Sequence, residues 1–195
     1  EHCRLSQVPS RASAKSTAKE SHFLNLTRLD PWMESLVLCS MRRAIMILFL
    51  GQELEFNALT CIDPVTNLVE MIRIENKTAA HIAQQFENLW LSRYPRPLRC
   101  IHDNGGEFIG WAFQRLLQQA GIVDAPTTSR NPTANSVCER MHQTVANVLR
   151  TVLNGGQAQN LQHAHQAIDN ALATAVHATR CSVSRALGVS SGGLV

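Results

Sequence analysis

Two acidic residues stand in surroundings that suit metal-dependent chemistry. Asp103 is followed by Asn104 and two glycines, and Glu139 comes after 35 intervening residues. Carboxylate oxygens are the ligands that Mg²⁺ prefers, and such ions assist phosphoryl transfer by neutralising charge on the attacking and leaving oxygens. Each acid alone has a plainer explanation, since Asp-Asn-Gly-Gly commonly forms a turn and a helical Glu is usually solvated. The chemistry therefore depends on a fold that brings the two carboxylates together.

The elements around the two acids are expected to place them at one edge of a sheet. Residues 98–102 form a predicted strand that ends at Asp103, and the glycines beyond it allow a tight turn. Residues 133–153 form a predicted helix that carries Glu139. Its expected apolar stripe, at helical spacing, consists of Val137, Met141, Val145, Val148 and Val152.

The remaining pattern predicts an α/β domain with a mixed sheet and helices on its faces. A turn at 63–67 joins two strands, Thr78 begins a helix, and Pro95 and Pro97 end it. The other predicted elements are strands at 54–61, 68–74 and 122–125 and helices at 78–94, 111–120 and 161–179. On the 68–74 strand, alternate residues are expected to face opposite sides of the sheet.

The two acidic stretches resemble the second and third acids of the D,D(35)E triad of retroviral and retrotransposon integrases. They read Cys-Ile-His-Asp-Asn-Gly-Gly-Glu-Phe at 100–108 and Asn-Pro-Thr-Ala-Asn-Ser-Val-Cys-Glu-Arg-Met-His at 131–142. The resemblance is closest to gypsy-type retrotransposon integrase cores. It implies a ribonuclease-H-like fold with a mixed five-stranded sheet flanked by helices. It also implies that Asp103 and Glu139 are catalytic metal ligands, for Mg²⁺ or alternatively Mn²⁺.

The same resemblance implies DNA as the partner, both the ends of the element and the target DNA. The activity it implies is metal-dependent 3′-end processing followed by strand transfer, carried out by a homo-oligomer. Asn104, Asn135, Arg140 and His142 are the expected nucleic-acid contacts. For His142, a place on the surface or in the packing competes with that role.

The first acid of the triad is missing at its expected place. In the family it lies on the first strand, in a stretch like Pro-Trp-x-x-Val-x-Val-Asp-Leu-x-Gly-Pro. Pro31 and Trp32 are present here, and counting from Trp32 puts Leu38 where the Asp should be. No Asp occurs from residue 31 to 62, and the family pattern returns near Gly51. We therefore hypothesise that residues 33–50 are translated in a shifted frame relative to an active ancestor.

Loss of the first acid predicts impaired catalysis, because a two-metal site then lacks a shared ligand. Asp30 and Asp63 are possible substitutes, but one precedes the strand and the other lies in a turn at the far end of the sheet. A non-catalytic module for nucleic-acid binding or multimerisation is therefore the alternative to an active integrase. An unrelated hydrolase of the same fold fits the spacing and the second motif less well.

The composition of the chain limits its possible functions less strongly than these motifs do. The net charge is +3, and residues 1–29 hold five basic and two acidic residues, so the rest of the chain is neutral overall. Charge alone gives little support for nucleic-acid binding. Six scattered cysteines without a C-x-x-C pair predict free thiols in a reducing compartment, nuclear or cytoplasmic. The apolar run at 44–50 is too short for a membrane helix, so no membrane partner is expected.

The expected organisation is a single domain with tails. Residues 1–29 are interpreted as a tail or linker, residues 30–155 as the integrase-like core with 33–50 atypical, and residues 156–195 as its C-terminal helix and tail. The register of the altered first strand cannot be predicted, because nothing but hydrophobicity specifies it.

Overall fold

The computed structural model describes residues 34–49, 52–127, 132–153, 158–184 and 187–194. Within these ranges the side chains of 41–49, 52–53 and 132–135 are not described. The strands are β1 (Ser35–Phe49), β2 (Gln52–Ile62), β3 (Val69–Ile74), β4 (Arg99–His102) and β5 (Val123–Pro126). The helices are α1 (Ala79–Phe86), the π-helical turn η2 (Glu87–Leu91), α2 (Gly106–Ile109), α3 (Trp111–Ala120), α4 (Pro132–Leu153), α5 (Leu161–Cys181) and the 3₁₀ turn η3 (Ser191–Gly193).

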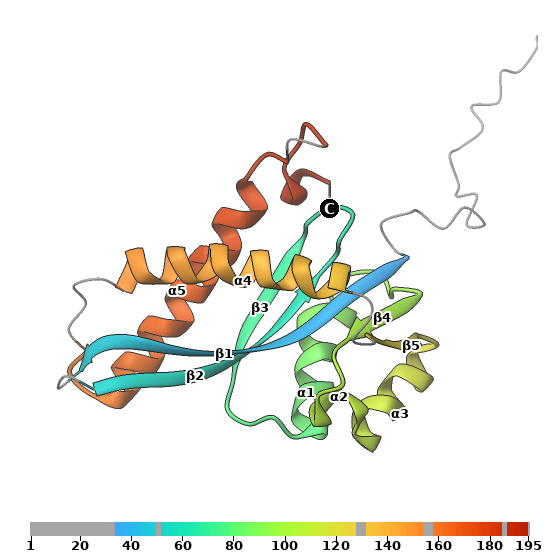
Figure 1. The fold of residues 1–195 in the computed structure, drawn as a ribbon, viewed down its shortest axis with the longest axis horizontal. Helices are drawn as coiled ribbons and strands as arrows, with labels where there is room; N and C mark the ends of the chain where they lie inside the picture. Colours follow the sequence, from blue (N-terminus) through green and yellow to red (C-terminus); the bar gives the residue numbers. More distant parts are fainter. Residues whose placement is uncertain (1–33, 50–51, 128–131, 154–157, 185–186, 195) are drawn as a thin grey trace, which may run out of the picture.

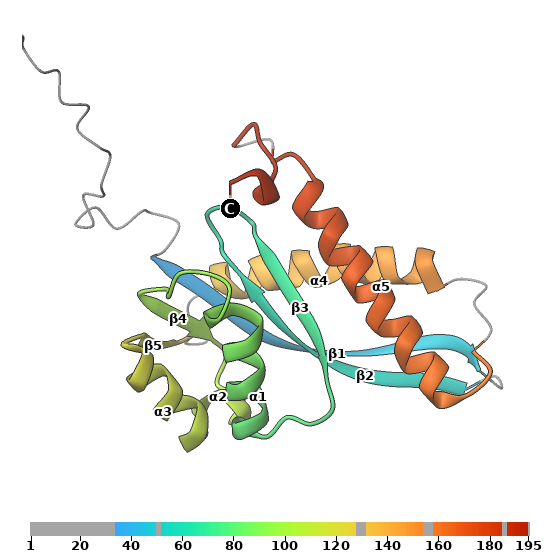
Figure 2. The same ribbon diagram turned by 180° about the vertical axis from the view of Figure 1, so that it is seen from behind.

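The five strands form one mixed sheet in the order β3-β2-β1-β4-β5. The first three strands are antiparallel neighbours, whereas β1, β4 and β5 run parallel, with Leu38 opposite His102. The β1–β2 hairpin extends well beyond the rest of the sheet (Figures 1 and 2). The predicted mixed sheet is thus confirmed, and the altered region at 33–50 supplies its central strand.

Helices cover both faces of the sheet, and each face has its own apolar core. One core lies under α4 and α5 and includes Val37, Val69, Met71, Val145 and Ile168. The other lies under α1, η2 and α3 and includes Leu36, Leu38, Ile82, Phe86 and Phe113. Figures 1 and 2 show α1, α2 and α3 gathered beside β4 and β5, and α4 and α5 along the β1, β2 and β3 part of the sheet. Because strand side chains alternate in direction, consecutive β1 residues serve different cores.

Local chemistry explains several element ends. Thr78 begins α1 by accepting the backbone N–H of His81 through its side chain, as predicted. Gly121 ends α3 with a φ of 69°, a left-handed conformation that glycine adopts at little cost. Helical structure after Thr78 ends at Leu91 rather than at residue 94. Ser92 caps it there, before the prolines are reached.

Two details of the sequence prediction were wrong. The short helix α2, directly after the Asn-Gly-Gly turn, was not predicted. The buried stripe of α4 is also rotated relative to the predicted one: Val152 is 47% exposed, while Cys138, Ala146, Leu149 and Leu153 are buried with Val145. A row of valines indicated the helix correctly but not the face, because alanine and cysteine also pack against the sheet.

Candidate metal and nucleic-acid site

Asp103 stands at the carboxyl end of β4, as predicted. The strand end is fixed by His102, which is buried; its Nε2 lies 2.5 Å from Asp124 Oδ1 and its Nδ1 lies 2.6 Å from the Asp103 carbonyl oxygen. The Asp103 side chain is half-buried, and its Oδ1 accepts the backbone N–H of Gly105 at 3.1 Å. Asp103 is therefore held at a defined position with part of its carboxylate open to a ligand.

A second carboxylate, Glu107, lies beside Asp103 and was missed by the sequence prediction. A Cβ placed on Gly105 would lie 2.8 Å from Glu107 Oε2 and 3.0 Å from Asp103 Oδ1. Glu107 Oε1 accepts the Ser40 hydroxyl at 2.7 Å, and Lys77 Nζ is 3.8 Å away. The available signal was its position four residues after Asp103, where a turn and a helix start bring it back toward that acid.

Glu139 lies on α4 and is exposed. The residue before it, Cys138, points to the sheet and is bonded to Cys39 of β1. Since β1 runs beside β4, with Leu38 opposite His102, Cys39 comes level with Asp103. The register and the disulfide thus place the backbones of Asp103 and Glu139 on either side of Cys39. The predicted convergence of their two carboxylates stays a prediction.

Leu38 and Cys39 face opposite sides of the sheet. Leu38 is 1% exposed and belongs to the core under α1 and α3. Cys39 packs with the core under α4 and α5. A ligand attached at residue 38 would therefore point away from Glu139, whereas residue 39 points toward α4. On this face the β1 position nearest the two acids holds a sulfur atom instead of a carboxylate.

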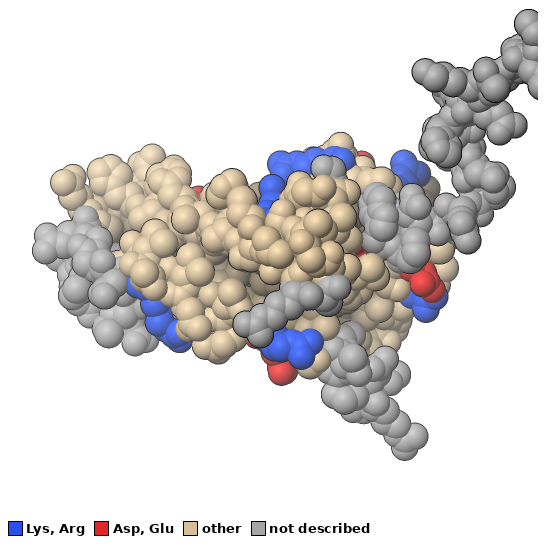
Figure 3. Space-filling view, turned by 90° about the horizontal axis from the view of Figure 1, so that it is seen from above, with Lys and Arg blue, Asp and Glu red and all other residues tan. Residues whose placement is uncertain are grey.

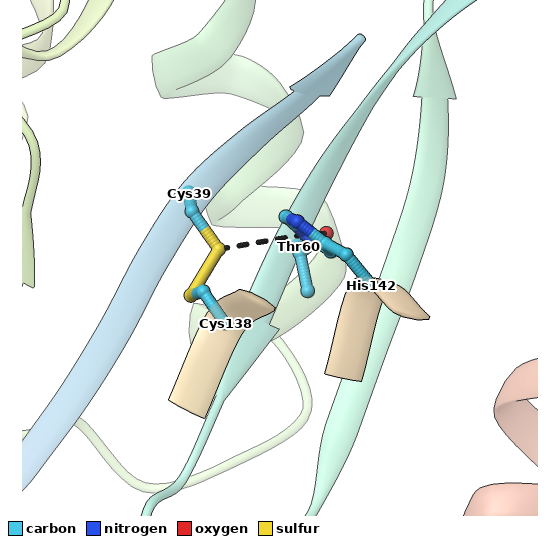
Figure 4. The surroundings of a disulfide bond; sticks show 4 residues. All are labelled: Cys39, Thr60, Cys138 and His142. Carbon is cyan, nitrogen blue, oxygen red and sulfur yellow. Dashed lines mark hydrogen bonds between the residues drawn. A yellow bond between two sulfur atoms is a disulfide. The ribbon is translucent and has the colours of Figure 1, made fainter. Parts of the chain in front are cut away.

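Two cysteines form a disulfide, contrary to the expected free thiols. Cys39 and Cys138 are joined across 99 residues of sequence with a Cα–Cα distance of 6.8 Å. His142, one helical turn after Cys138, places its Nε2 at 3.6 Å from Cys39 Sγ and 3.1 Å from Thr60 Oγ1 (Figure 4). The sequence could not reveal this pairing, because it depends on the packing of α4 over β1. Cys61, Cys100 and Cys181 are free thiols.

The residues predicted to contact nucleic acid differ in their exposure and in their partners. Asn104 is exposed, with its Nδ2 donating to the Thr127 carbonyl oxygen at 3.3 Å, and Arg140 is exposed on α4. His142 lies against β1 and β2, so its imidazole is engaged with the sheet. Asn135 belongs to α4, but its side chain lies outside the described residues. Their roles toward DNA stay predictions.

Asp63, one of the two possible substitute acids, is not at this end of the sheet. Asp63 is buried in the β2–β3 turn, where Oδ1 accepts the Val65 N–H at 2.9 Å and Oδ2 accepts the Thr66 hydroxyl at 2.5 Å. Both of its oxygens therefore stabilise the turn. Asp30 lies outside the described residues.

The donor atoms near Asp103 suit a hard cation only in part. Asp103 and Glu107 offer adjacent carboxylates, and Glu139 lies on the neighbouring helix. Mg²⁺ is commonly bound by one or two carboxylates and completed by water and phosphate oxygens. Within the described part of the chain, however, no group of three or more His, Cys, Asp or Glu side chains is arranged to hold a metal ion. Asp103 and Glu107 could supply carboxylate ligands to a single Mg²⁺, and the described residues show no larger set of ligands that a two-ion site would require.

Comparison with solved structures identifies the architecture. The catalytic core domain of BIV integrase aligns with a TM-score of 0.61 and 18% identity, over 81% of this chain and 91% of that one. The fold is that of a retroviral integrase catalytic core. The HTLV-2 integrase core, solved in complex with magnesium in a trimeric form, aligns with a TM-score of 0.64 and 15% identity, over 83% and 95% of the two chains. The predicted ribonuclease-H-like fold is confirmed.

A larger assembly also contains this fold. A chain of the simian T-cell lymphotropic virus intasome, solved in complex with the PP2A regulatory subunit B56 gamma, aligns with a TM-score of 0.64 and 16% identity. The match covers 81% of this chain but 53% of that one, so this chain spans about half its length. No family model and no curated protein sequence matches the chain. In the helices that the structure describes, none is long and apolar enough to cross a membrane.

Proposed function

We propose that this chain is an integrase-like core of a gypsy-type retrotransposon that binds DNA and one divalent cation, with impaired strand transfer. The integrase fold supports the integrase part of the proposal, as does the placement of the Asp103 and Glu139 backbones on either side of Cys39. The observation that carries the impaired part is Cys39. It stands level with Asp103 on the face toward α4, where a third carboxylate would have to project.

In the proposed site, Asp103 and Glu139 hold Mg²⁺, with Mn²⁺ as the alternative, and Glu107 lies ready beside Asp103. The bound ion would neutralise charge on a phosphate of a DNA end. Asp103 is oriented by the Gly105 N–H, and Glu139 is carried at the position fixed by Cys138. The proposed site binds no second ion, because β1 supplies no carboxylate for it.

The DNA part of the proposal rests on fold and site more than on charge. In Figure 3 the lysine and arginine side chains of the face shown form separate small groups rather than one continuous basic surface. Phosphate contacts scale with the number of cations placed along the backbone. We therefore propose weak, salt-sensitive DNA binding, centred on Asn104, Asn135 and Arg140. Association of several copies, as in the trimeric HTLV-2 core, would increase it.

A non-catalytic binding or multimerisation module is the second candidate. The Cys39–Cys138 bond favours the non-catalytic module, because a disulfide occupies the position at which an active enzyme would need a free metal ligand. The two candidates differ in metal binding. One weak Mn²⁺ site that depends on Asp103 supports the proposed single-ion core, whereas no Mn²⁺ binding at all favours the module.

The decisive experiment restores an acid at residue 39. In Cys39→Asp we expect a second Mn²⁺ to bind and strand transfer on a labelled DNA duplex to rise by orders of magnitude, because a missing ligand is returned. Cys39→Ser is the matched control, since it also removes the disulfide but adds no carboxylate. Glu139→Gln should abolish any gain.

Two results would contradict the proposal. Robust Mg²⁺-dependent strand transfer by the unaltered chain, lost in Glu139→Gln, would show that catalysis is not impaired. A gain in Leu38→Asp but not in Cys39→Asp would place the first ligand at residue 38. That residue lies in the opposite core, where an unpaired charge is costly and the variant should be destabilised.

A further inference from the structure

The disulfide lies at the junction on which the candidate site depends. Cys39 is level with Asp103, and Cys138 directly precedes Glu139. Figure 4 shows the bond between the two cysteines. The bond therefore links the strand beside one acid to the helix that carries the other. Any change in this bond alters how firmly Glu139 is positioned relative to Asp103.

Helix α4 does not need the bond in order to stay on the sheet. Its second half is anchored by apolar side chains, since Val145, Leu149 and Leu153 are all buried in the core shared with α5. In the first half, Cys138 is the one described side chain that is fully buried, and Val137 and Met141 are only partly buried against the same core. Opening the bond would thus loosen the segment that carries Glu139 while the rest of the helix stays in place.

The surroundings of this pair also differ from those of the buried thiols. Burial raises the pKa of the Cys61 and Cys100 thiols, which keeps them protonated and unreactive. Cys39 is only half-buried, and the His142 imidazole lies 3.6 Å from its sulfur, where a ring nitrogen can take up a thiol proton. Thr60 holds that nitrogen at 3.1 Å. Reactive cysteines occupy this kind of partly open, polar setting.

We propose that Cys39 and Cys138 form a reversible thiol–disulfide switch that fixes Glu139 relative to Asp103 when closed. Disulfides in proteins exposed to cellular thiols are mostly transient or redox-sensing, which agrees with the reducing compartment expected from the cysteine pattern. The inference deepens the proposed function, because it regulates the same site. The reversible opening and closing of the disulfide does not depend on metal binding and can be tested without it.

The reaction is an exchange with a low-molecular-weight disulfide such as oxidised glutathione. The Cys39 thiol gives its proton to His142, and its sulfur attacks one glutathione sulfur and expels the other as a thiolate. The Cys138 sulfur then attacks Cys39 in the mixed disulfide and expels the second glutathione. Two protein thiols are oxidised, one glutathione disulfide is reduced, and the two protons end on two glutathione thiols. Excess reduced glutathione drives the reverse reaction.

The first test measures the exchange itself. The folded chain is equilibrated with glutathione at stepwise ratios of reduced to oxidised form, alkylated, and digested for mass spectrometry. We expect the Cys39–Cys138 peptide pair to convert reversibly within this range, while Cys61 and Cys100 stay as thiols. A pair that remains fully bonded in reduced glutathione, or fully open in oxidised glutathione, would overturn the proposal.

The second test measures the helix without metal. Hydrogen exchange of peptides covering residues 136–144 should become several-fold faster on reduction, while that of 145–153 changes little. Cys138→Ser should behave as the reduced form under all conditions, and Cys181→Ser, which alters an exposed thiol outside the pair, should switch normally. Equal exchange in both states would show that the bond does not position Glu139.

The third test joins the switch to the site. The Mn²⁺ affinity should be roughly tenfold higher in the oxidised form, comparable to the effect of losing a positioning contact at a metal site. If the pair cycles and the exchange rates change but neither form binds Mn²⁺, the switch stands and the proposed metal function fails. If Mn²⁺ binds equally in both forms, the metal function stands and the control of Glu139 is wrong.

Discussion

At the scale of single residues, the difference between positions 38 and 39 decides what the site can do. Successive side chains of a strand point to opposite faces of the sheet. A shift of one residue therefore moves a side chain from the apolar core to the candidate site, or the reverse. Leu38 is packed under α1 and α3, and Cys39 faces α4. Counting from Trp32 could locate the missing acid along the chain but could not determine the face. A thiol, moreover, is a soft ligand that does not replace a carboxylate for Mg²⁺.

Gly105 offers a test of the carboxylates at this scale. In Gly105→Ala the new Cβ would meet Glu107 Oε2 at 2.8 Å and Asp103 Oδ1 at 3.0 Å, so both carboxylates must move. Side-chain ends move cheaply, and we expect a loss of stability below about 1 kcal/mol. Because Asp103 is a proposed ligand and would be displaced together with the neighbouring Glu107, we expect the Mn²⁺ affinity to fall roughly tenfold.

The matched control is Gly106→Ala, whose Cβ would meet no atom within 4 Å. Calorimetric titration with Mn²⁺ and thermal unfolding of both variants separate the two effects. Equal Mn²⁺ affinity in the two variants would mean that the position of the Asp103 carboxylate does not determine ion binding.

At the scale of elements, most of the architecture could be predicted from local chemistry. The β2–β3 hairpin followed from alternating apolar residues around an Asp-Pro turn, and α1 followed from the Thr78 cap and the stripe of Ile82, Phe86, Leu89 and Trp90, all of which are buried. Features that depend on contacts distant in sequence were not predictable. The register of β1, the sheet-facing side of α4 and the Cys39–Cys138 bond are set by packing between elements.

The ion pair between Glu70 and Arg180 joins two such elements, β3 and α5, as does the pair between Arg73 and Asp169. Glu70 is 3% exposed and accepts hydrogen bonds from the Arg180 guanidinium and, at 2.5 Å, from the Tyr94 hydroxyl. Burial and this bond to Glu70 raise the pKa of Tyr94. In Arg180→Ala the buried carboxylate loses its close cation, and we expect the free energy of unfolding to fall by about 2 kcal/mol.

Arg99→Ala is the control, because its pair with Glu34 is solvent-exposed and should contribute no more than about 0.5 kcal/mol. Urea unfolding at pH 7 measures both variants. Arg93 Nη1 also lies 3.9 Å from Glu70 Oε1. A loss in Arg180→Ala as small as that in Arg99→Ala would mean that Tyr94 and Arg93 alone satisfy Glu70.

At the scale of the whole molecule, the two apolar cores hold their cysteines in different states, one as a disulfide and the other as free thiols. The core under α4 and α5 contains the bonded pair Cys39 and Cys138, at its boundary with the candidate site. The core under α1 and α3 encloses Cys61 and Cys100 completely. One face of the sheet therefore holds a bonded pair of cysteines, of which Cys39 is half-buried and Cys138 is buried. On the other face, the thiols of Cys61 and Cys100 pack as buried apolar groups. Their burial makes the free energy of unfolding depend on pH in the alkaline range.

This pH dependence follows from proton linkage. Burial, followed by the influence of nearby acidic groups, raises the pKa of Cys61 and Cys100 above the ordinary value of 9.0. Above pH 9 the unfolded chain releases these protons while the folded chain keeps them. The unfolded state then binds fewer protons, so the free energy of unfolding falls as pH rises, by up to about 1.4 kcal/mol per pH unit for each thiol. Below pH 9 neither thiol contributes a slope.

Urea unfolding between pH 8 and pH 10.5, in a reductant that prevents disulfide exchange, measures this slope. The double variant Cys61→Ala with Cys100→Ala should start from a lower stability, because two buried sulfurs are lost, yet decline less steeply above pH 9. Cys181→Ala should leave the slope unchanged, since that thiol is exposed. The raised pKa of Tyr94 leaves a smaller decline above pH 10 in every variant. An unchanged slope in the double variant would mean that the α1 and α3 face opens to solvent before the thiols titrate.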